Sequence, residues 1–218
     1  MIILKATRLK KSFRSPQYVD VLSDISLEVS EGESIAITGR SGSGKTTLLH
    51  ILGTLEPFDS GELLIAGKTF NTSEAPLLRN QRIGFIFQAF NLLEDFTALE
   101  NVLMPLRIAR KMTSREQGLH LLSLVGLTDR ADFPVKLLSG GERQRIAIAR
   151  ALANDPDILF ADEPSGNLDR ATADSVSNLL FDLVRAHHKT LILVTHDTDF
   201  SSRCTRKYLL SCGALQQI

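Results

Sequence analysis

The sequence predicts an α/β fold with a parallel sheet, a phosphate-binding loop and a helical insertion. An apolar run at 34–38 leads through a glycine-rich loop into a helical run at 47–52. Residues 97–126 have helical spacing, and the chain after residue 142 alternates between helices and short apolar strands. Strand–helix–strand order of this kind indicates parallel strands covered on both faces.

The first third of the chain consists mainly of predicted strands. Residues 25–29 alternate apolar and polar side chains, and a turn at 31–33 precedes the strand at 34–38. Residues 61–68 indicate a strand closed by a turn, and an apolar strand at 83–87 ends at Gln88.

The loop after the strand at 34–38 has the composition of a phosphate-binding loop. Its residues are Gly39, Arg40, Ser41, Gly42, Ser43, Gly44, Lys45, Thr46 and Thr47. The glycines allow backbone N–H groups to point inward and to hold phosphate oxygens at the positive end of a helix. Lys45 is expected to reach the β- and γ-phosphates, and the Thr46 hydroxyl to bind Mg²⁺. The alternative is a glycine-rich turn before an ordinary helix, and the flanking strand and helix argue against it.

Helices are predicted in the middle of the chain, between residues 97 and 126. Two apolar stripes support them, one of Leu99, Val102, Leu103 and Leu106 and one that includes Leu119, Leu121, Leu122 and Val125. Ser114, with Gln117 three residues later, is a predicted N-cap, and Gly126 is a predicted stop.

The last third returns to alternating helices and strands. A helix over about 142–153 leads to a strand at 158–161, and a helix near 171–187 leads to a strand at 191–195. The chain has no long linker, low-complexity tract or internal repeat. We therefore expect one domain over 1–218, with a helical subdomain inserted at about 89–140.

Composition narrows the class of protein. The 25 Lys and Arg residues balance the 25 Asp and Glu residues, which argues against nucleic-acid binding driven by counterion release. No apolar run approaches the roughly 18 residues that span a bilayer, and no basic region precedes the short apolar N-terminal stretch. Cys204 and Cys212 have no disulfide-framework or metal-site spacing and suit a reducing compartment. A cytosolic domain is expected.

Two acidic residues follow the strand at 158–161. Asp162 is positioned at the carboxyl end of a strand to bind Mg²⁺, directly or through water. Glu163 stands where it could polarise a water molecule for attack on a γ-phosphate. Two acids that merely cap a turn are the alternative, and the phosphate-binding loop elsewhere in the chain disfavours it.

A second anion-binding helix end is predicted at residues 138–144. Ser139 can cap this helix, and Gly140 and Gly141, followed by Glu142, leave its first N–H groups uncovered. One nucleotide does not need two such sites. A head-to-tail homodimer explains both, with each nucleotide held by one chain's phosphate-binding loop and the other chain's Ser-Gly-Gly helix.

These segments resemble the motifs of ATP-binding cassette (ABC) ATPases, in order and over essentially the whole chain. Residues 138–144 resemble the signature motif, 39–46 the Walker A motif and 158–163 the Walker B motif. Gln88 resembles the Q-loop glutamine, Asp169 lies in a segment that resembles the D-loop, and His196 resembles the switch histidine. Phe13 fits the aromatic position that stacks on adenine, and Tyr18 is its rival. Without the family order, Phe13 could be a core or surface ring, Gln88 a strand-end polar residue and His196 a helix cap.

The resemblance implies a P-loop NTPase with a RecA-like parallel-sheet core, an N-terminal antiparallel β subdomain and an inserted helical subdomain. It also implies ATP and Mg²⁺ as cofactors. Glu163 would activate water, His196 would steady the γ-phosphate, and Gln88 would link the Mg²⁺ ligands to the helical insertion. Glu142 stands where the family usually has Gln, and Thr46 where Ser is commoner; both variants occur in the family.

Residues 85–93 and 97–102 are similar to one subfamily, which contains lipoprotein-releasing, macrolide-exporter and cell-division ATPases. The resemblance implies transmembrane permease subunits as partners and a peripheral position on the cytoplasmic face of the inner membrane. Few residues follow His196, which favours a stand-alone subunit, and we favour the lipoprotein-releasing type. An ABC ATPase that acts on nucleic acid or ribosomes is the competing class. The short span from Lys45 to Ser139 and the single cassette argue against it.

Overall fold

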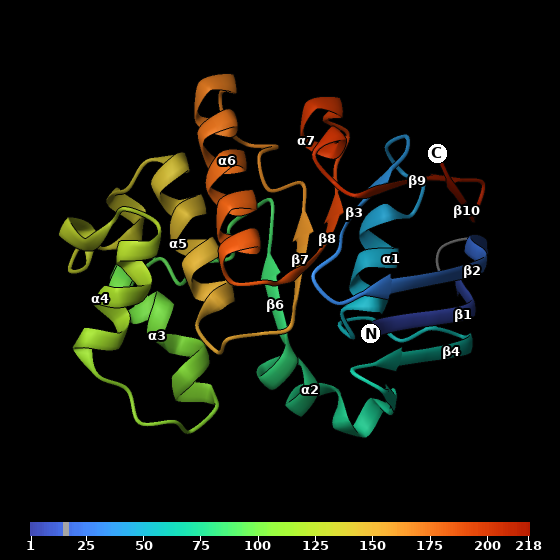
Figure 1. Ribbon diagram of the computed structural model, residues 1–218, viewed down its shortest axis with the longest axis horizontal. Helices are drawn as coiled ribbons and strands as arrows, with labels where there is room; N and C mark the ends of the chain where they lie inside the picture. The colour runs from blue at the N-terminus through green and yellow to red at the C-terminus, as the bar shows by residue number, and fades with distance from the viewer. Residues whose placement is uncertain (15–17) are drawn as a thin grey trace. The chain divides into compact units, whose positions relative to one another are not determined.

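The computed structural model describes residues 1–14 and 18–218, and its chain divides into two compact units. One unit contains residues 1–79 and 190–218, and the other contains residues 80–189. Figure 1 shows the elements of both units along the chain.

The first unit contains an antiparallel sheet. Apolar, buried residues alternate with polar, exposed residues along much of its long strands. Its order is β2 (Val19–Ser30), β1 (Ile2–Phe13), β4 (Ser60–Ile65) and β5 (Lys68–Thr69). Leu4 on β1 lies opposite Val29 on β2 and Ile65 on β4, and all three side chains are buried. The strand predicted at 25–29 is therefore part of β2, and the strand and turn predicted at 61–68 correspond to β4, the turn after it and the first residue of β5. The expected antiparallel β subdomain is present.

The same unit contains four strands of a second, mixed sheet, in the order β10 (Ala214–Gln217), β9 (Arg206–Ser211), β3 (Ser34–Thr38) and β8 (Thr190–Val194). β3 runs parallel to both β8 and β9, as the α/β prediction requires. Helix α1 (Lys45–Leu52) packs against β8, and α7 (Thr198–Ser202) packs against β3. The short η1 (Thr72–Glu74) and α2 (Ala75–Arg82) follow β5.

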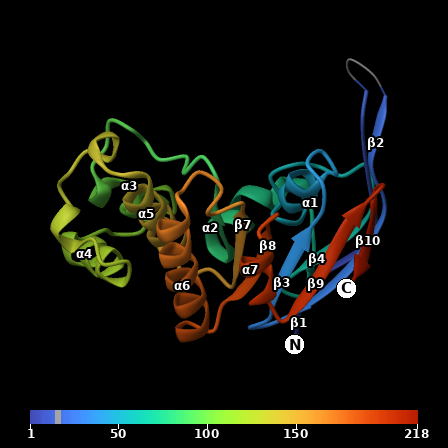
Figure 2. The same ribbon diagram turned by 90° about the horizontal axis from the view of Figure 1, so that it is seen from above.

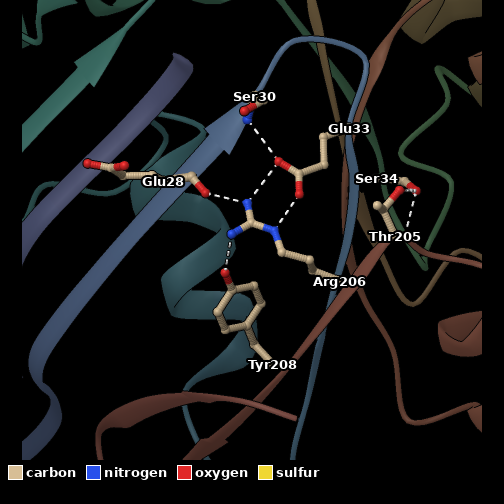
Figure 3. A network of polar contacts seen from close by, with 7 residues as sticks. All are labelled: Glu28, Ser30, Glu33, Ser34, Thr205, Arg206 and Tyr208. Carbon is tan, nitrogen blue, oxygen red and sulfur yellow. Dashed lines mark hydrogen bonds and ion pairs between the residues drawn. The ribbon is translucent and has the colours of Figure 1, made fainter. Parts of the chain in front are cut away.

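A polar network fixes β9 to the turn between β2 and β3 (Figure 3). The Arg206 guanidinium pairs with the Glu33 carboxylate and also donates to the Glu28 carbonyl at 2.6 Å and to the Tyr208 hydroxyl at 2.8 Å. The Ser30 N–H donates to the second Glu33 oxygen at 2.9 Å. Burial disfavours the ionised Glu33, but the bonds from Arg206 and Ser30 outweigh it, so the pKa of Glu33 lies below its ordinary value.

The second unit contains the parallel pair β6 (Ile83–Ile86) and β7 (Ile158–Asp162). Phe160 on β7 is fully buried and stacks on Phe85 of β6, with ring centroids 5.3 Å apart. Truncation of such a ring to Ala typically costs about 3–5 kcal/mol. The apolar composition of these two strands thus determines their burial on both faces.

Four helices and two short 3-10 turns make up the rest of this unit. They are α3 (Ala98–Ile108), α4 (Arg115–Leu124), η2 (Thr128–Arg130), η3 (Val135–Leu137), α5 (Gly140–Leu152) and α6 (Arg170–Ala186). Helices α3, α4 and α5 pack on one another, and α5 and α6 lie side by side (Figures 1 and 2).

Capping residues and glycines in the sequence predicted the ends of α4, while two other predicted boundaries differ by one or two residues. Ser114 Oγ accepts from the Gln117 N–H at 3.2 Å and Gln117 bonds back to the Ser114 N–H, so the predicted N-cap of α4 is confirmed. Gly126, with φ of 72°, follows the end of α4. The helix predicted from about 142 begins two residues earlier, because Ser139 caps it. The strand predicted to reach Phe87 ends at Ile86. In the part of the chain described, no helix is long and apolar enough to cross a membrane.

Candidate functional site

The predicted phosphate-binding loop connects β3 to α1, as the sequence requires. The N-cap of α1 is Gly44, which provides no side-chain hydrogen bond. Five other helices have side-chain caps, from Thr97, Ser114, Ser139, Asp169 and Asp197. The first backbone N–H groups of α1 are therefore left without a side-chain cap, an arrangement that suits an anionic ligand.

Gly44 is required at this position for two reasons. Its φ is 95°, a conformation that other residues rarely adopt. A Cβ here would also lie 2.6 Å from Val21 Cγ1 on β2. The loop is thus seated against the antiparallel sheet, a contact that the sequence motif alone does not reveal.

Lys45 and Ser43 provide polar groups inside the loop. Lys45 is buried, and its Nζ donates to the Gly39 and Arg40 carbonyls at 3.0 and 3.1 Å. The ammonium therefore lies across the loop whose N–H groups would bind phosphate. Ser43 Oγ is buried, with no hydrogen-bond partner among the described residues. Both groups fit an anionic ligand.

The two aromatic candidates for adenine stacking lie at the end of the β1–β2 hairpin. Phe13 ends β1 opposite Val19, is 40% exposed, and has Lys11 Nζ 4.9 Å from its ring centroid. Tyr18 is 64% exposed, and its hydroxyl donates to Asp20 at 2.7 Å. Both residues are exposed, so Phe13 and Tyr18 remain alternatives.

His196 follows β8 and is exposed. The N-cap of α7 is the next residue, Asp197, whose Oδ1 accepts from the Asp199 and Phe200 N–H groups at 2.8 and 3.1 Å. The alternative that His196 is itself a helix cap is therefore wrong. Asp197 fixes the turn in which His196 lies.

In the second unit, Asp162 is the buried last residue of β7, so the strand predicted at 158–161 extends one residue further than expected. Glu163 comes next in a left-handed conformation with φ of 44°. This conformation typically costs a non-glycine residue about 1–3 kcal/mol, and such strain is concentrated at functional sites. The Gly166 N–H donates to the Glu163 carbonyl at 2.9 Å and closes the turn.

The predicted signature helix is capped in both directions. Ser139 Oγ accepts from the Glu142 N–H at 3.3 Å, and Glu142 Oε2 accepts from the Ser139 N–H and hydroxyl at 2.9 and 2.8 Å. Glu142 Oε1 accepts from Arg130 Nε at 3.0 Å. The bonds from Ser139, followed by that from Arg130, lower the pKa of Glu142. The residue is therefore an ionised carboxylate at the start of α5.

The signature and D-loop segments lie against each other. A Cβ at Gly141 would lie 2.5 Å from Thr172 Cγ2, so only glycine allows this close approach. Asp169 is the N-cap of α6, and its Oδ1 accepts from the Thr172 N–H at 3.1 Å. The close approach of Gly141 to Thr172 thus brings the starts of α5 and α6 into contact.

Gln88, just after β6, contacts the D-loop segment through Asn167. Gln88 Nε2 donates to Asn167 Oδ1 at 3.3 Å, and Asn167 Nδ2 donates to the Gln88 carbonyl at 2.9 Å. This reciprocal pair joins two segments 79 residues apart in the chain. Sequence reasoning placed both segments but did not single out Asn167.

Two side chains hold the segment after Gln88 by its backbone. Arg150 of α5 donates to the carbonyls of Phe90, at 2.9 Å, and Asn91, two consecutive residues with positive φ. Burial lowers the pKa of Arg150. Asn101 of α3 is fully buried and bonds to both the N–H and the carbonyl of Leu93, at 2.8 and 3.1 Å. Sequence reasoning missed both side chains, because their distance along the chain from this segment matches no local sequence motif.

These features define a P-loop ATPase. Residues 22–166 match the family model described as ABC transporter, so the chain belongs to the ABC transporter ATP-binding family. It is 52% identical to the lipoprotein-releasing system ATP-binding protein LolD of Protochlamydia amoebophila over 98% of this chain and 96% of the relative. It is 42% identical to the LolD protein of Saccharophagus degradans over 99% and 97%.

Solved structures of the ATP-binding cassette MJ0796 have the same fold. A dimeric structure in a post-hydrolysis state, bound to ADP and Pi, matches with a TM-score of 0.90 and 36% identity over 99% of this chain and 98% of that chain. A second dimeric structure matches with a TM-score of 0.89 and the same identity over 98% and 97%. The chain is therefore an ATP-binding and ATP-hydrolysing subunit of an ABC transporter, and the predicted fold and activity are confirmed.

Proposed function

We propose that this ATPase drives release of lipoproteins from the inner membrane, through separate transmembrane permease subunits. The identity of 52% to a lipoprotein-releasing ATPase over nearly the full length of both chains carries this proposal. The subunit works on the cytoplasmic face of the membrane as a homodimer that ATP closes. Dimeric structures of a cassette 36% identical to this chain support that assembly.

Each nucleotide is held by both chains of the homodimer. Residues 39–47 hold the phosphates through backbone N–H groups and Lys45. The start of α5 in the second copy, formed by Ser139, Gly140, Gly141 and Glu142, closes over the γ-phosphate, with Ser139 and Gly141 in contact with it. Phe13, or its rival Tyr18, stacks on adenine, and Asp169 fixes the segment that precedes α6. The uncapped start of α1 and the buried Ser43 hydroxyl support this use of the loop.

Three residues with oxygen donors of the kind that Mg²⁺ prefers would bind the ion. They are the Thr46 hydroxyl, the Asp162 carboxylate and the Gln88 amide oxygen. The buried Asp162 at the end of β7 fits this role. Bound Mg²⁺ would neutralise charge on the β- and γ-phosphates. Glu163 accepts a proton from the attacking water, and His196 stabilises charge that develops on the γ-phosphate.

Reconstitution tests this function. The chain is co-expressed with the permease subunits of its own organism, purified as a complex and inserted into vesicles loaded with a lipoprotein. ATP should release the lipoprotein to a soluble acceptor, and the Glu163→Gln complex should not. A complex that turns over ATP but releases no lipoprotein would contradict the proposal and favour another exporter or a cell-division role.

A further inference from the structure

The N-terminus of the signature helix α5 carries an acidic residue where, under the proposed function, an anionic ligand binds. Under the proposed function, the N-terminus of α5 faces the ATP bound by the second copy, and the helix dipole favours an anion there. Glu142 puts a full negative charge in the first turn of the same helix. Its reciprocal cap with Ser139 stabilises the helix, but its charge repels a triphosphate.

Arg130 is placed to cancel that charge. Its Nε lies 3.0 Å from Glu142 Oε1, while the other oxygen of Glu142 is bonded to Ser139. The pair is part-exposed, with 45% of the Arg130 and 26% of the Glu142 side chain accessible. Both carboxylate oxygens are therefore engaged, and the ion pair leaves the start of α5 without a net negative charge.

The position of Arg130 is itself fixed by local structure. It is the last residue of η2, and its guanidinium carbon lies 5.0 Å from the centroid of the Phe133 ring. The Phe133 N–H donates to the Arg130 carbonyl at 3.0 Å. A cation stacked on a ring gains attraction in addition to its ion pair.

The pairing is specific to a carboxylate. Glutamine at 142 could keep the reciprocal cap with Ser139, because Glu and Gln both serve in a capping box. Its amide has a single oxygen and an NH₂ group, and Arg has only donors, so glutamine could not accept from both Ser139 and Arg130 equally well. The arginine is therefore best matched by the carboxylate of this Gly-Gly-Glu signature.

We propose that Arg130 is a positioning residue that neutralises Glu142 and thereby makes this signature helix competent to bind the second copy's ATP. The inference rests on the proposed two-chain site. Arg130 acts through Glu142 and touches no reacting atom. Its removal weakens ATP-driven closure of the dimer and leaves ATP binding to a single chain intact.

The test measures ATP-driven dimer formation by size-exclusion chromatography in full-length Glu163→Gln protein, in which closure is separated from turnover. Arg130→Gln should raise the ATP concentration at which dimer formation is half-maximal by roughly ten-fold. This is the effect expected when one charge changes near a part-exposed helix N-terminus. Adding Glu142→Gln should restore it to within about two-fold, since both charges are then absent. Arg130→Lys, which keeps the charge, should stay close to the parent.

The rescue decides between a charge effect and simple support of the fold. Thermal melting should give similar midpoints for all variants, and fluorescent-nucleotide binding to the monomer should be unchanged. If Glu142→Gln fails to rescue Arg130→Gln, or if Arg130→Gln closes normally, the inference is wrong while the two-chain site stands. If the Glu163→Gln parent itself forms no ATP-dependent dimer, the proposed site fails and the inference fails with it.

Discussion

Glu163, the proposed general base, lies in a strained backbone conformation. It follows the buried Asp162 in a left-handed conformation, and the turn after it is closed by the Gly166 N–H. The strain is maintained because β7 is buried along its whole length. The sequence predicted the position of both acids from the strand before them, but the conformation of Glu163 has no sequence signal.

Glu163→Gln should abolish steady ATP turnover and trap an ATP-bound dimer. The amide keeps the shape of the side chain but cannot accept a proton, and loss of a general base typically costs about 10²–10⁴-fold. Turnover is measured by phosphate release and the dimer by size-exclusion chromatography with ATP. Hydrolysis at the wild-type rate would remove Glu163 from the role of base.

Lys45→Ala and Ser139→Arg should fail in different ways. Lys45→Ala removes the cation that lies across the phosphate-binding loop, so nucleotide binding to the single chain should weaken. Ser139→Arg should leave that binding largely intact, because in the proposed dimer Ser139 serves the nucleotide of the second copy, yet it should stop closure and turnover. Titration of the monomer with fluorescent ATP separates the two. Equal loss of monomer binding in both variants would contradict the two-chain site.

At the scale of helices and strands, the sequence predicted features set by neighbouring residues and missed hydrogen bonds between segments far apart in the chain. The cap of α4 and the glycine that follows it lie within a few residues of the helix they end, so their spacing is readable. The start of α5 was placed late, although its capping residue Ser139 was recognised. Arg150 and Asn167 bond to segments 60 and 79 residues away, and no local pattern encodes such partners.

The link between β9 and the β2–β3 turn should make part of the stability depend on pH. The pKa of Glu33 is below its ordinary value in the folded state, so its contribution is present above that value and is lost as the pH falls through the folded pKa. Arg206→Met should destabilise the protein at pH 7, because it leaves a half-buried carboxylate without its main partner.

The difference between Arg206→Met and the wild type should narrow below about pH 4.5, where Glu33 becomes protonated in the unfolded state and then in the folded state. Urea denaturation at pH 7 and pH 3.5 measures both differences. Arg185→Met, which removes an exposed i, i+3 ion pair with Asp182, is a matched control and should change little at either pH. A pH-independent difference for Arg206→Met would show that Glu33 is not the group responsible.

At the scale of the whole molecule, alternation of strands and helices was enough to predict the α/β class. The family order of the motifs added the antiparallel subdomain, which strand patterns alone left unassigned. Coupling to a membrane partner is a property of the assembly. Under the proposed function, the segment after Gln88 is a candidate for this contact, because Arg150 and Asn101 hold its backbone while Leu93 is 42% exposed.

Leu93→Ser should therefore abolish co-purification with the permease subunits and leave the basal ATPase activity of the isolated subunit nearly unchanged. The Leu93 backbone bonds to Asn101 do not depend on the side chain, so the fold should tolerate the change within about 0.5 kcal/mol. An apolar side chain exposed beside a rigid backbone suits helix-in-groove recognition of a cytosolic permease helix. Ile108→Ser, at an apolar position of α3 that is 67% exposed, is the matched control and should still co-purify. If both folded variants retain the complex, Leu93 has no part in docking; if both lose it, the contact depends on general surface hydrophobicity rather than on this segment.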